Sequence, residues 1–414
     1  MRPVPLPSPL PVGRFARDSV VAAGTALGFG SIVEPDPVQV AAAYRSDRHL
    51  RIDGATPDVW SLLSRFWRTA DGWVRTHGNY AHHAAALFAG LDLPDGAEVG
   101  ELADRLEFMT SDAAASTVRA AGGICAAVRA EDPTVDAALR QHPLVEITRL
   151  GDSTPVPLAQ ATATAPLAGI RVLDLTRVIA GPVATRTLAF AGADVLRIDP
   201  PNLPEPAWQH LDTGHGKRSA LLDIVREPAH FARLLAAADV VVLGYRPEGL
   251  ARLGLSPERL AAEHPHLVIA QLSAWPGDAS PRGFDSIVQA DSGISLLCGS
   301  DDEPGALPAQ ALDHSAGYLL AAGVVTALRR RAEIGGAWQV RTSLRRMAAE
   351  LLGMPRGTTT STAPITDADA DAPRTQTFEV DGHRLTTVAP AVVWPGAPKL
   401  YPSPRPWGRD AAEW

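Results

Sequence analysis

Short apolar runs alternate with amphipathic segments between residues 166 and 350. Apolar runs with the length of buried strands lie at 169–175, 193–198, 219–223, 239–243 and 267–273, and helical patterns at 181–192, 227–238 and 257–264 separate most of them. Strands that alternate with helices in this way form parallel sheets with helices on both faces. The pattern predicts an α/β fold built on an open, mostly parallel sheet.

A longer apolar run, 316–328, follows Asp313 and ends before basic residues 329–331 and the glycine pair 335–336. This predicts a buried helix from Asp313 to about residue 335, followed by a half-buried strand at 338–344. Gly317 and Gly323 inside the helix indicate either close approach of another backbone or close packing. A helix N-terminus favours the anionic form of a carboxylate, so Asp313 is the candidate nucleophile. An aspartate that only caps the helix is the alternative interpretation.

The first 152 residues have a less regular pattern, and we expect them to form a smaller α+β region. Residues 1–12 are rich in proline and are expected to be an arm, and helices are predicted at 57–67 and 99–121. Short alternating strands around Asp71-Gly72 predict a hairpin that leads into a helix near Tyr80. Residues 153–165, rich in Pro, Thr and Ala, are predicted to be a linker.

The C-terminal region divides into two parts. Residues 351–375 are polar and of low complexity, which predicts a second linker. Residues 376–414 contain two short strands around Asp381-Gly382 and a Pro-rich tail, which we expect to cover another surface of the protein.

Composition excludes several classes of protein. The chain has 414 residues, 46% of them hydrophobic, and a net charge of -8, which fits a globular protein and argues against a general nucleic-acid binder. Cys125 and Cys298 are the only cysteines, so neither a disulfide framework nor a structural zinc site is expected, and a reduced cytoplasmic setting fits. The apolar stretch 20–33 is too short and too rich in glycine for a membrane anchor. The histidines at 77, 82 and 83 lack the carboxylate or cysteine partners of a metal site.

Several basic residues lie near predicted strand ends. Lys217 and Arg218 precede one strand, and Arg246 and Arg252 follow another, beside the aromatic ring of Tyr245. Such a cluster suits the phosphates and base of a nucleotide-type cofactor, and scattered surface arginines are the alternative.

A nicotinamide or flavin enzyme is a further alternative. Asp199 ends the second strand, where a ribose ligand of a dinucleotide site would lie. The first strand-to-helix turn, DLTRVIAGP, nevertheless lacks the G-x-G-x-x-G pattern. We therefore disfavour a dinucleotide cofactor.

Several ordered blocks together resemble the family III CoA-transferases, the group that includes formyl-CoA transferase, carnitine CoA-transferase and the α-methylacyl-CoA racemases. The blocks are PLAGIRVLDLTRVIAGPVATRTLAFAGADVLRIDPP, GHGKRSALLDI, ADVVVLGYRPEGLARLGL, HPHLVIAQLSAW, GFDSIVQADSGI and LDHSAGYLLAAGVVTALRRR. The resemblance implies a Rossmann-like large domain over residues 166–350, with the active-site aspartate of the family at Asp313.

This resemblance also implies a mechanism and a set of partners. The aspartate would attack an acyl-CoA thioester, pass through a mixed anhydride and an aspartyl-CoA thioester, and deliver coenzyme A to a carboxylic acid acceptor. It implies a homodimer, and the composition described above predicts a cytoplasmic protein that needs no metal, nucleic acid or membrane. Its expected CoA-binding residues are Arg177, Ala180, Gly181, Lys217, Arg218, Tyr245, Arg246 and Arg252.

Three positions depart from the family pattern. Phe284 stands where the racemases have a histidine, which disfavours racemisation. Ile179 and Pro200 replace a polar and a basic residue, and the glycine-rich substrate loop of the family is not found. These departures motivate the alternative of a non-catalytic acyl-CoA-binding homologue or a partner subunit of a transferase. The segment FWRTADGWVRT resembles the small domain of the family but precedes Asp313. The resemblance therefore implies a rearranged domain order, or the second half of a longer duplicated ancestor.

Overall fold

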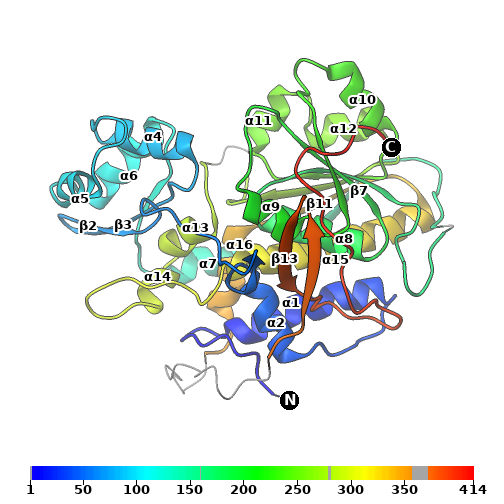
Figure 1. Ribbon diagram of the computed structural model, residues 1–414, viewed down its shortest axis with the longest axis horizontal. Helices are drawn as coiled ribbons and strands as arrows, with labels where there is room; N and C mark the ends of the chain where they lie inside the picture. The colour runs from blue at the N-terminus through cyan, green and yellow to red at the C-terminus, as the bar shows by residue number, and fades with distance from the viewer. Residues whose placement is uncertain (1, 159, 278–280, 357–371) are drawn as a thin grey trace.

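A seven-stranded sheet forms the centre of the computed structural model, which describes residues 2–158, 160–277, 281–356 and 372–414 (Figure 1). The strand order is β5-β11-β10-β9-β6-β7-β8, and all neighbours are parallel except β5, which is antiparallel to β11. The strands are β5 (Glu146–Gly151), β6 (Arg171–Leu175), β7 (Asp194–Asp199), β8 (Lys217–Leu221), β9 (Val240–Leu243), β10 (Val268–Ser273) and β11 (Ala337–Ser343). This architecture confirms the predicted open, mostly parallel α/β sheet.

Helices cover both faces of the sheet because successive strand residues point to opposite sides. Val172 packs with α8 (Ala180–Phe190) and α15 (Ala311–Ile334) in one core, whereas Leu173 packs in a second core on the other face. The helices of that second face are α10 (Pro228–Ala236), α11 (Pro247–Arg252) and α12 (Pro257–Glu263). Within the described part of the chain, α15 alone is long and apolar enough to cross a membrane, but 83% of its apolar window is buried, as expected for a core helix.

The chain reverses its direction across the sheet between β6 and β9. It runs outward from β6 through β7 to β8, and then returns to place β9 on the other side of β6. The loops after β6 and β9 therefore diverge at the carboxyl edge. Crevices that bind ligands form at such switch points of open α/β sheets.

The N-terminal helices join the large sheet rather than the smaller region expected for residues 1–152. Phe15 and Val20 of α1 (Val12–Leu27) share a core with Tyr318 of α15, because the apolar side of α1 needs a buried partner. Strand β5 also extends the large sheet. Short elements follow α1, namely α2 (Pro37–Tyr44), α3 (Ser46–His49) and β1 (Arg51–Ile52).

A small unit with its own core projects from one side of the molecule (Figure 1). It contains β2 (Phe66–Thr69), β3 (Gly72–Thr76), β4 (Cys125–Ala127), α4 (Ala81–Gly90), α5 (Val99–Glu107) and α6 (Ser111–Ala120), and α7 (Pro133–Arg140) follows it. The predicted hairpin and the helix after Tyr80 are confirmed, although the turn residues are 70 and 71, because Thr69 pairs with Gly72.

Two helix predictions for this region are wrong. Residues 57–67 contain no helix, and Trp67 is buried in β2 between exposed or partly exposed neighbours, which is the period of a strand. The helix expected over 99–121 divides into α5 and α6, because Thr110 accepts a hydrogen bond from the N–H of Ala113 and so begins a new helix.

The C-terminal strands form a hairpin, β12 (Thr375–Val380) and β13 (His383–Val388), whose Asp381-Gly382 turn has positive φ angles of 53° and 82°. The tail then runs along β8, where the carboxylate of Asp410 accepts a hydrogen bond of 2.8 Å from the N–H of Ser219. Of the linker expected at 351–375, residues up to 353 continue α16 (Leu344–Gly353), and residues 357–371 lie outside the described part of the chain.

Candidate active site

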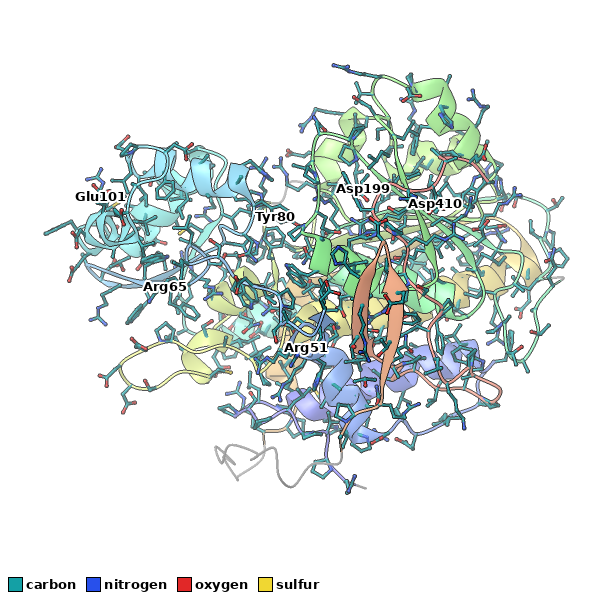
Figure 2. The ribbon with its side chains drawn as sticks, in the orientation of Figure 1. Arg51, Arg65, Tyr80, Glu101, Asp199 and Asp410 are labelled. Atoms are coloured by element: carbon teal, nitrogen blue, oxygen red, sulfur yellow. The ribbon has the colours of Figure 1, made fainter. Side chains whose placement is uncertain are left out.

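A cavity of about 360 Å³ opens at the carboxyl edge of the sheet, where the loops after β6 and β9 diverge. Figure 2 shows Tyr80 on the side of the small unit that faces the sheet, so the cavity lies between the two. Its lining includes the loops after β6 and β9, the aspartate of α15 and three residues of the small unit. These residues are Arg177, Val178, Ile179, Ala180, Gly181, Gly244, Tyr245, Arg246, Asp313, Tyr80, His82 and His83.

Asp313 is the third residue of α15 and not its N-cap. The helix begins at Ala311, and Gln310 occupies the capping position without a side-chain hydrogen bond to the helix. Asp313 is 6% exposed and lines the cavity. The predicted helix is confirmed, but its first turn starts two residues before the predicted cap.

Asp285 supplies the carboxylate that the first turn of α15 needs. It lies at the start of α13 (Asp285–Asp291), which precedes α14 (Ile294–Leu297), and its Oδ2 accepts a hydrogen bond of 2.9 Å from the N–H of Asp313. The side chain of Gln289 donates a hydrogen bond to Oδ1 of Asp285, and its own oxygen accepts from the N–H of Leu307 at 2.8 Å. No local pattern indicates this pair, because its members are separated by 28 residues.

Burial and like charge decide the ionisation of Asp313. Burial raises the pKa of this carboxyl well above its usual range, and the charge of Asp285 raises it further. Burial also raises the pKa of Asp285, while its hydrogen bonds from Gln289 and the helix N–H groups lower it. Burial and the charge of Asp285 therefore oppose the effect expected of the helix N-terminus, since Asp285 lies at the same end of the helix and accepts a hydrogen bond from the N–H of Asp313.

The loop after β6 is held in a strained conformation. Val178 has a φ of 73°, which is unfavourable for a β-branched residue, and its N–H donates a hydrogen bond of 2.7 Å to Glu205. Glu205 is buried and paired with Arg197. At the start of α8, a Cβ on Gly181 would lie 2.4 Å from the Cβ of Thr176, so only glycine fits there.

Three arginines are among the residues that line this cavity. The guanidinium of Arg177 lies 5.4 Å from the ring centre of Tyr80 and donates a hydrogen bond of 2.9 Å to the carbonyl of Pro204. Arg246 comes from the loop after β9, and Arg282, which the sequence had not singled out, completes the set. Clustered guanidinium groups suit phosphate groups.

Three of the predicted binding residues do not reach the cavity. Lys217 is buried, with its Nζ 3.2 Å from Asp174 and 3.0 Å from the carbonyl of Pro182. Arg218 lies near the amino end of β8 and pairs with Asp194 at 2.8 Å. Arg252 is exposed at the end of α11 and is not part of the lining. Their positions near strand ends in the sequence could not show that these side chains lie outside the cavity.

A second cavity, of about 260 Å³, meets the first at Asp313. The two share Val178, Ile179, Phe284 and Asp313 as lining residues. The imidazole of His77 also lines the second cavity and stacks on Phe284 with 4.0 Å between ring centres. Asp313 is therefore accessible to a molecule in either cavity.

Two other kinds of site receive no support from the geometry. Over the described ranges of the chain, no three His, Cys, Asp or Glu side chains are grouped so that they could hold a metal ion. Asp199, considered above as a ribose ligand, is buried against Arg197 at 2.7 Å and accepts a hydrogen bond from the indole of Trp407.

Comparison with known proteins finds related sequences that cover somewhat less than half of this chain. A probable fatty acyl-CoA transferase of Mycobacterium tuberculosis is 33% identical over 205 residues, which cover 45% of this chain and 52% of that protein. A formyl-CoA:oxalate CoA-transferase of a Bradyrhizobium species is 30% identical over 189 residues, 42% of this chain and 44% of the relative. The chain thus spans about half the length of these curated relatives.

Solved structures match a similar share of the chain. The crystal structure of a hypothetical protein from Mycobacterium tuberculosis is 33% identical, with a TM-score of 0.41 over 45% of this chain and 58% of its own. The family model described as CoA-transferase family III matches residues 167–389, just over half of the chain. This chain therefore belongs to CoA-transferase family III.

Proposed function

We propose that this protein transfers coenzyme A from an acyl-CoA thioester to a carboxylic acid, with Asp313 as the nucleophile. The observation that supports this most directly is the position of Asp313, a buried carboxylate where an arginine-lined cavity meets a second cavity. The CoA portion of the substrate can lie on one side of such a carboxylate, and the acyl group or acid on the other. A carboxylate nucleophile divides a difficult acyl exchange into easier covalent steps.

The proposed exchange begins when a carboxylate oxygen of Asp313 attacks the thioester carbonyl. The carbon–sulfur bond breaks, CoA leaves as the thiolate, and a mixed anhydride remains. The thiolate then attacks the carbonyl of Asp313, which releases the donor acid as a carboxylate and leaves an aspartyl-CoA thioester. The acceptor carboxylate repeats the two steps in reverse, which regenerates the carboxylate of Asp313.

In this proposal the first cavity holds CoA. Arg177, Arg246 and Arg282 would bind its phosphates, and Tyr245, which is 38% exposed, would offer a ring to the adenine. Ala180 and Gly181 would allow the pantetheine arm to pass close to the backbone at the start of α8. Lys217, Arg218 and Arg252 take no part.

Intact-protein mass spectrometry after incubation with a panel of acyl-CoA thioesters tests this chemistry. We expect a covalent CoA adduct that hydroxylamine converts to a hydroxamate at Asp313, and peptide mapping would assign the position. The matched control is Asp313→Asn, which keeps the shape of the side chain and should form no adduct. An adduct that persists in this variant would contradict the assignment of Asp313.

The specific departures at Ile179 and Pro200 favour a second candidate, a non-catalytic acyl-CoA-binding protein or partner subunit of a transferase. Ile179 lines both cavities, where the family resemblance implies a polar residue. Saturable binding of acyl-CoA by calorimetry, with no adduct on any thioester of the panel, would favour this candidate.

We further propose a homodimer in the cytoplasm, on the strength of the family resemblance. Light scattering on the purified protein tests the dimer, and fractionation of the native cells tests the compartment.

A further inference from the structure

Arg75 is a cation without an acidic partner in the second cavity. It lies on β3, partly buried, with its guanidinium 4.8 Å from the ring centre of Phe66 and 6.0 Å from that of Trp60. Among the residues that the structure describes, none forms an ion pair with it, and its buried Nε has no hydrogen-bond partner. Burial alone lowers the pKa of this guanidinium to about 10, so it stays charged at neutral pH.

His77 adds unpartnered polar atoms to the same wall of the cavity. It follows Arg75 by two residues and is 5% exposed. Neither ring nitrogen has a hydrogen-bond partner within the described residues. Because burial lowers the pKa of His77 to about 3, the ring is neutral and presents one N–H donor.

The carboxylates of the cavity do not satisfy Arg75. Asp212 accepts a hydrogen bond of 2.6 Å from the hydroxyl of Ser46. Burial raises the pKa of Asp212, and the positive charge of Arg186 and this hydrogen bond oppose that effect. Asp47 lies near enough to Asp212 for the charge of one to raise the pKa of the other. Neither of them forms an ion pair with Arg75 at the distances in this structure.

We propose that Arg75 binds a second, distal carboxylate of the acid that exchanges CoA, so that the substrates of this protein are dicarboxylic acids and their CoA thioesters. The role of the first carboxylate rests on the function proposed above, in which it reacts at Asp313. The second would reach into the cavity toward the β3 wall and accept hydrogen bonds from the guanidinium and from His77.

The reason is the cost of leaving a desolvated charge unpaired. A monocarboxylic acid in this cavity would exclude water from the guanidinium and give it no counter-ion in return. A dicarboxylate supplies the counter-ion and can accept two parallel hydrogen bonds from the guanidinium fork. Discrimination against an analogue that lacks such a group is strong, because the polar partner is then left unpaired.

Calorimetric titration at neutral pH, with free CoA present, tests this proposal without any turnover. The probes are pairs of equal chain length, namely succinate and butanoate, glutarate and pentanoate, and adipate and hexanoate. In the wild-type protein we expect at least one dicarboxylate to bind about ten-fold or more tightly than its monocarboxylate, about 1.4 kcal/mol or more. Arg75→Met should abolish this difference, and Arg75→Lys should retain part of it.

The matched control is Arg68→Met. Arg68 lies on the same hairpin, exposed, over the ring of Trp73, and it lines neither cavity described here, so the preference for dicarboxylates should be unchanged. A wild-type protein that binds no dicarboxylate more tightly than its partner overturns the proposal, whatever the variants do. A preference that survives in Arg75→Met overturns it as well.

The two proposals fail separately. If the dicarboxylate preference depends on Arg75 but no CoA adduct forms at Asp313, the transferase chemistry is contradicted and the binding site stands. If the adduct forms but each pair of acids binds equally, the transferase stands and the role of Arg75 is contradicted.

Discussion

The backbone N–H of Asp313 donates a hydrogen bond of 2.9 Å to the carboxylate of Asp285. The carboxylate that stabilises the start of α15 therefore comes from α13, and Asp313 is left facing the cavities. A second carboxylate so near raises the pKa of Asp313. The same contact that orders the helix also reduces the fraction of Asp313 that is ionised.

Replacing Asp285 should make Asp313 ionise at lower pH. Asp285→Asn keeps an acceptor for the N–H of Asp313 but removes the negative charge that raises its pKa. Because the nucleophile must be ionised, we expect the acid limb of the kcat/KM profile to move down by about one pH unit. A full pH–rate profile checks this, and an unchanged limb would contradict the electrostatic coupling.

Replacing Asp313 itself should stabilise the protein near neutral pH. A carboxyl whose folded pKa is raised above its usual 3.8 stabilises the fold only at low pH, and this contribution is lost as the pH rises toward the folded pKa. We expect the free energy of unfolding of Asp313→Asn to exceed that of the wild type by about 1–3 kcal/mol at pH 8. Urea titrations at pH 8 and pH 5 measure it, and the gain should shrink at the lower pH. A gain that grows on acidification would be incompatible with a raised pKa.

Lys217 should matter for stability and not for CoA binding directly. Lys217→Met leaves the buried carboxylate of Asp174 without its counter-ion, which should cost about 3–5 kcal/mol of unfolding free energy. The matched change Arg218→Met removes the more exposed pair with Asp194, together with a hydrogen bond to the carbonyl of Glu413 and a contact with the ring of Trp414. It should still cost less than the loss of Lys217, because these contacts lie nearer to solvent. Urea denaturation measures the free energy of unfolding of both variants. Equal losses of this free energy would contradict the role of Lys217 as the buried counter-ion of Asp174.

Gly317 allows α15 to approach α8 closely. A Cβ at this position would lie 2.6 Å from the carbonyl oxygen of Ala180 and 2.8 Å from the Cβ of Val183. Gly317→Ala should therefore cost about 1–3 kcal/mol and lower kcat/KM, since Ala180 lines the first cavity. The control is Gly100→Ala in α5, where a Cβ meets nothing within 4 Å and stability should change by less than about 0.5 kcal/mol.

Arg246 and Arg252 give a matched pair for the CoA site. Arg246 lines the first cavity and Arg252 does not, although both belong to the loop and helix after β9. Arg246→Met should weaken CoA binding about ten-fold by removing a charged hydrogen bond to phosphate, and Arg252→Met should leave it unchanged. Calorimetry with free CoA measures both, and equal effects would favour a diffuse electrostatic attraction instead of a defined site.

The sequence could predict those features that depend on local pattern. The apolar runs of the strands, the helix of α15 and the hairpins at residues 66–76 and 375–388 follow from periodicity and turn residues that neighbours along the chain provide. The order of the sequence blocks led to the family, and the glycines inside α15 correctly indicated close packing. The regular alternation of strands and helices was sufficient for the fold class.

Only the tertiary structure decided which side chains meet. Asp285 lies 28 residues before Asp313, and Arg75 and His77 come from a hairpin more than 200 residues away, so no local pattern relates them. The same is true of Lys217, whose charge is used by a buried partner 43 residues upstream. Periodicity determines which residues of an element face the core, but burial and charge depend on contacts between distant elements, and these set the ionisation of Asp313 and the composition of both cavities.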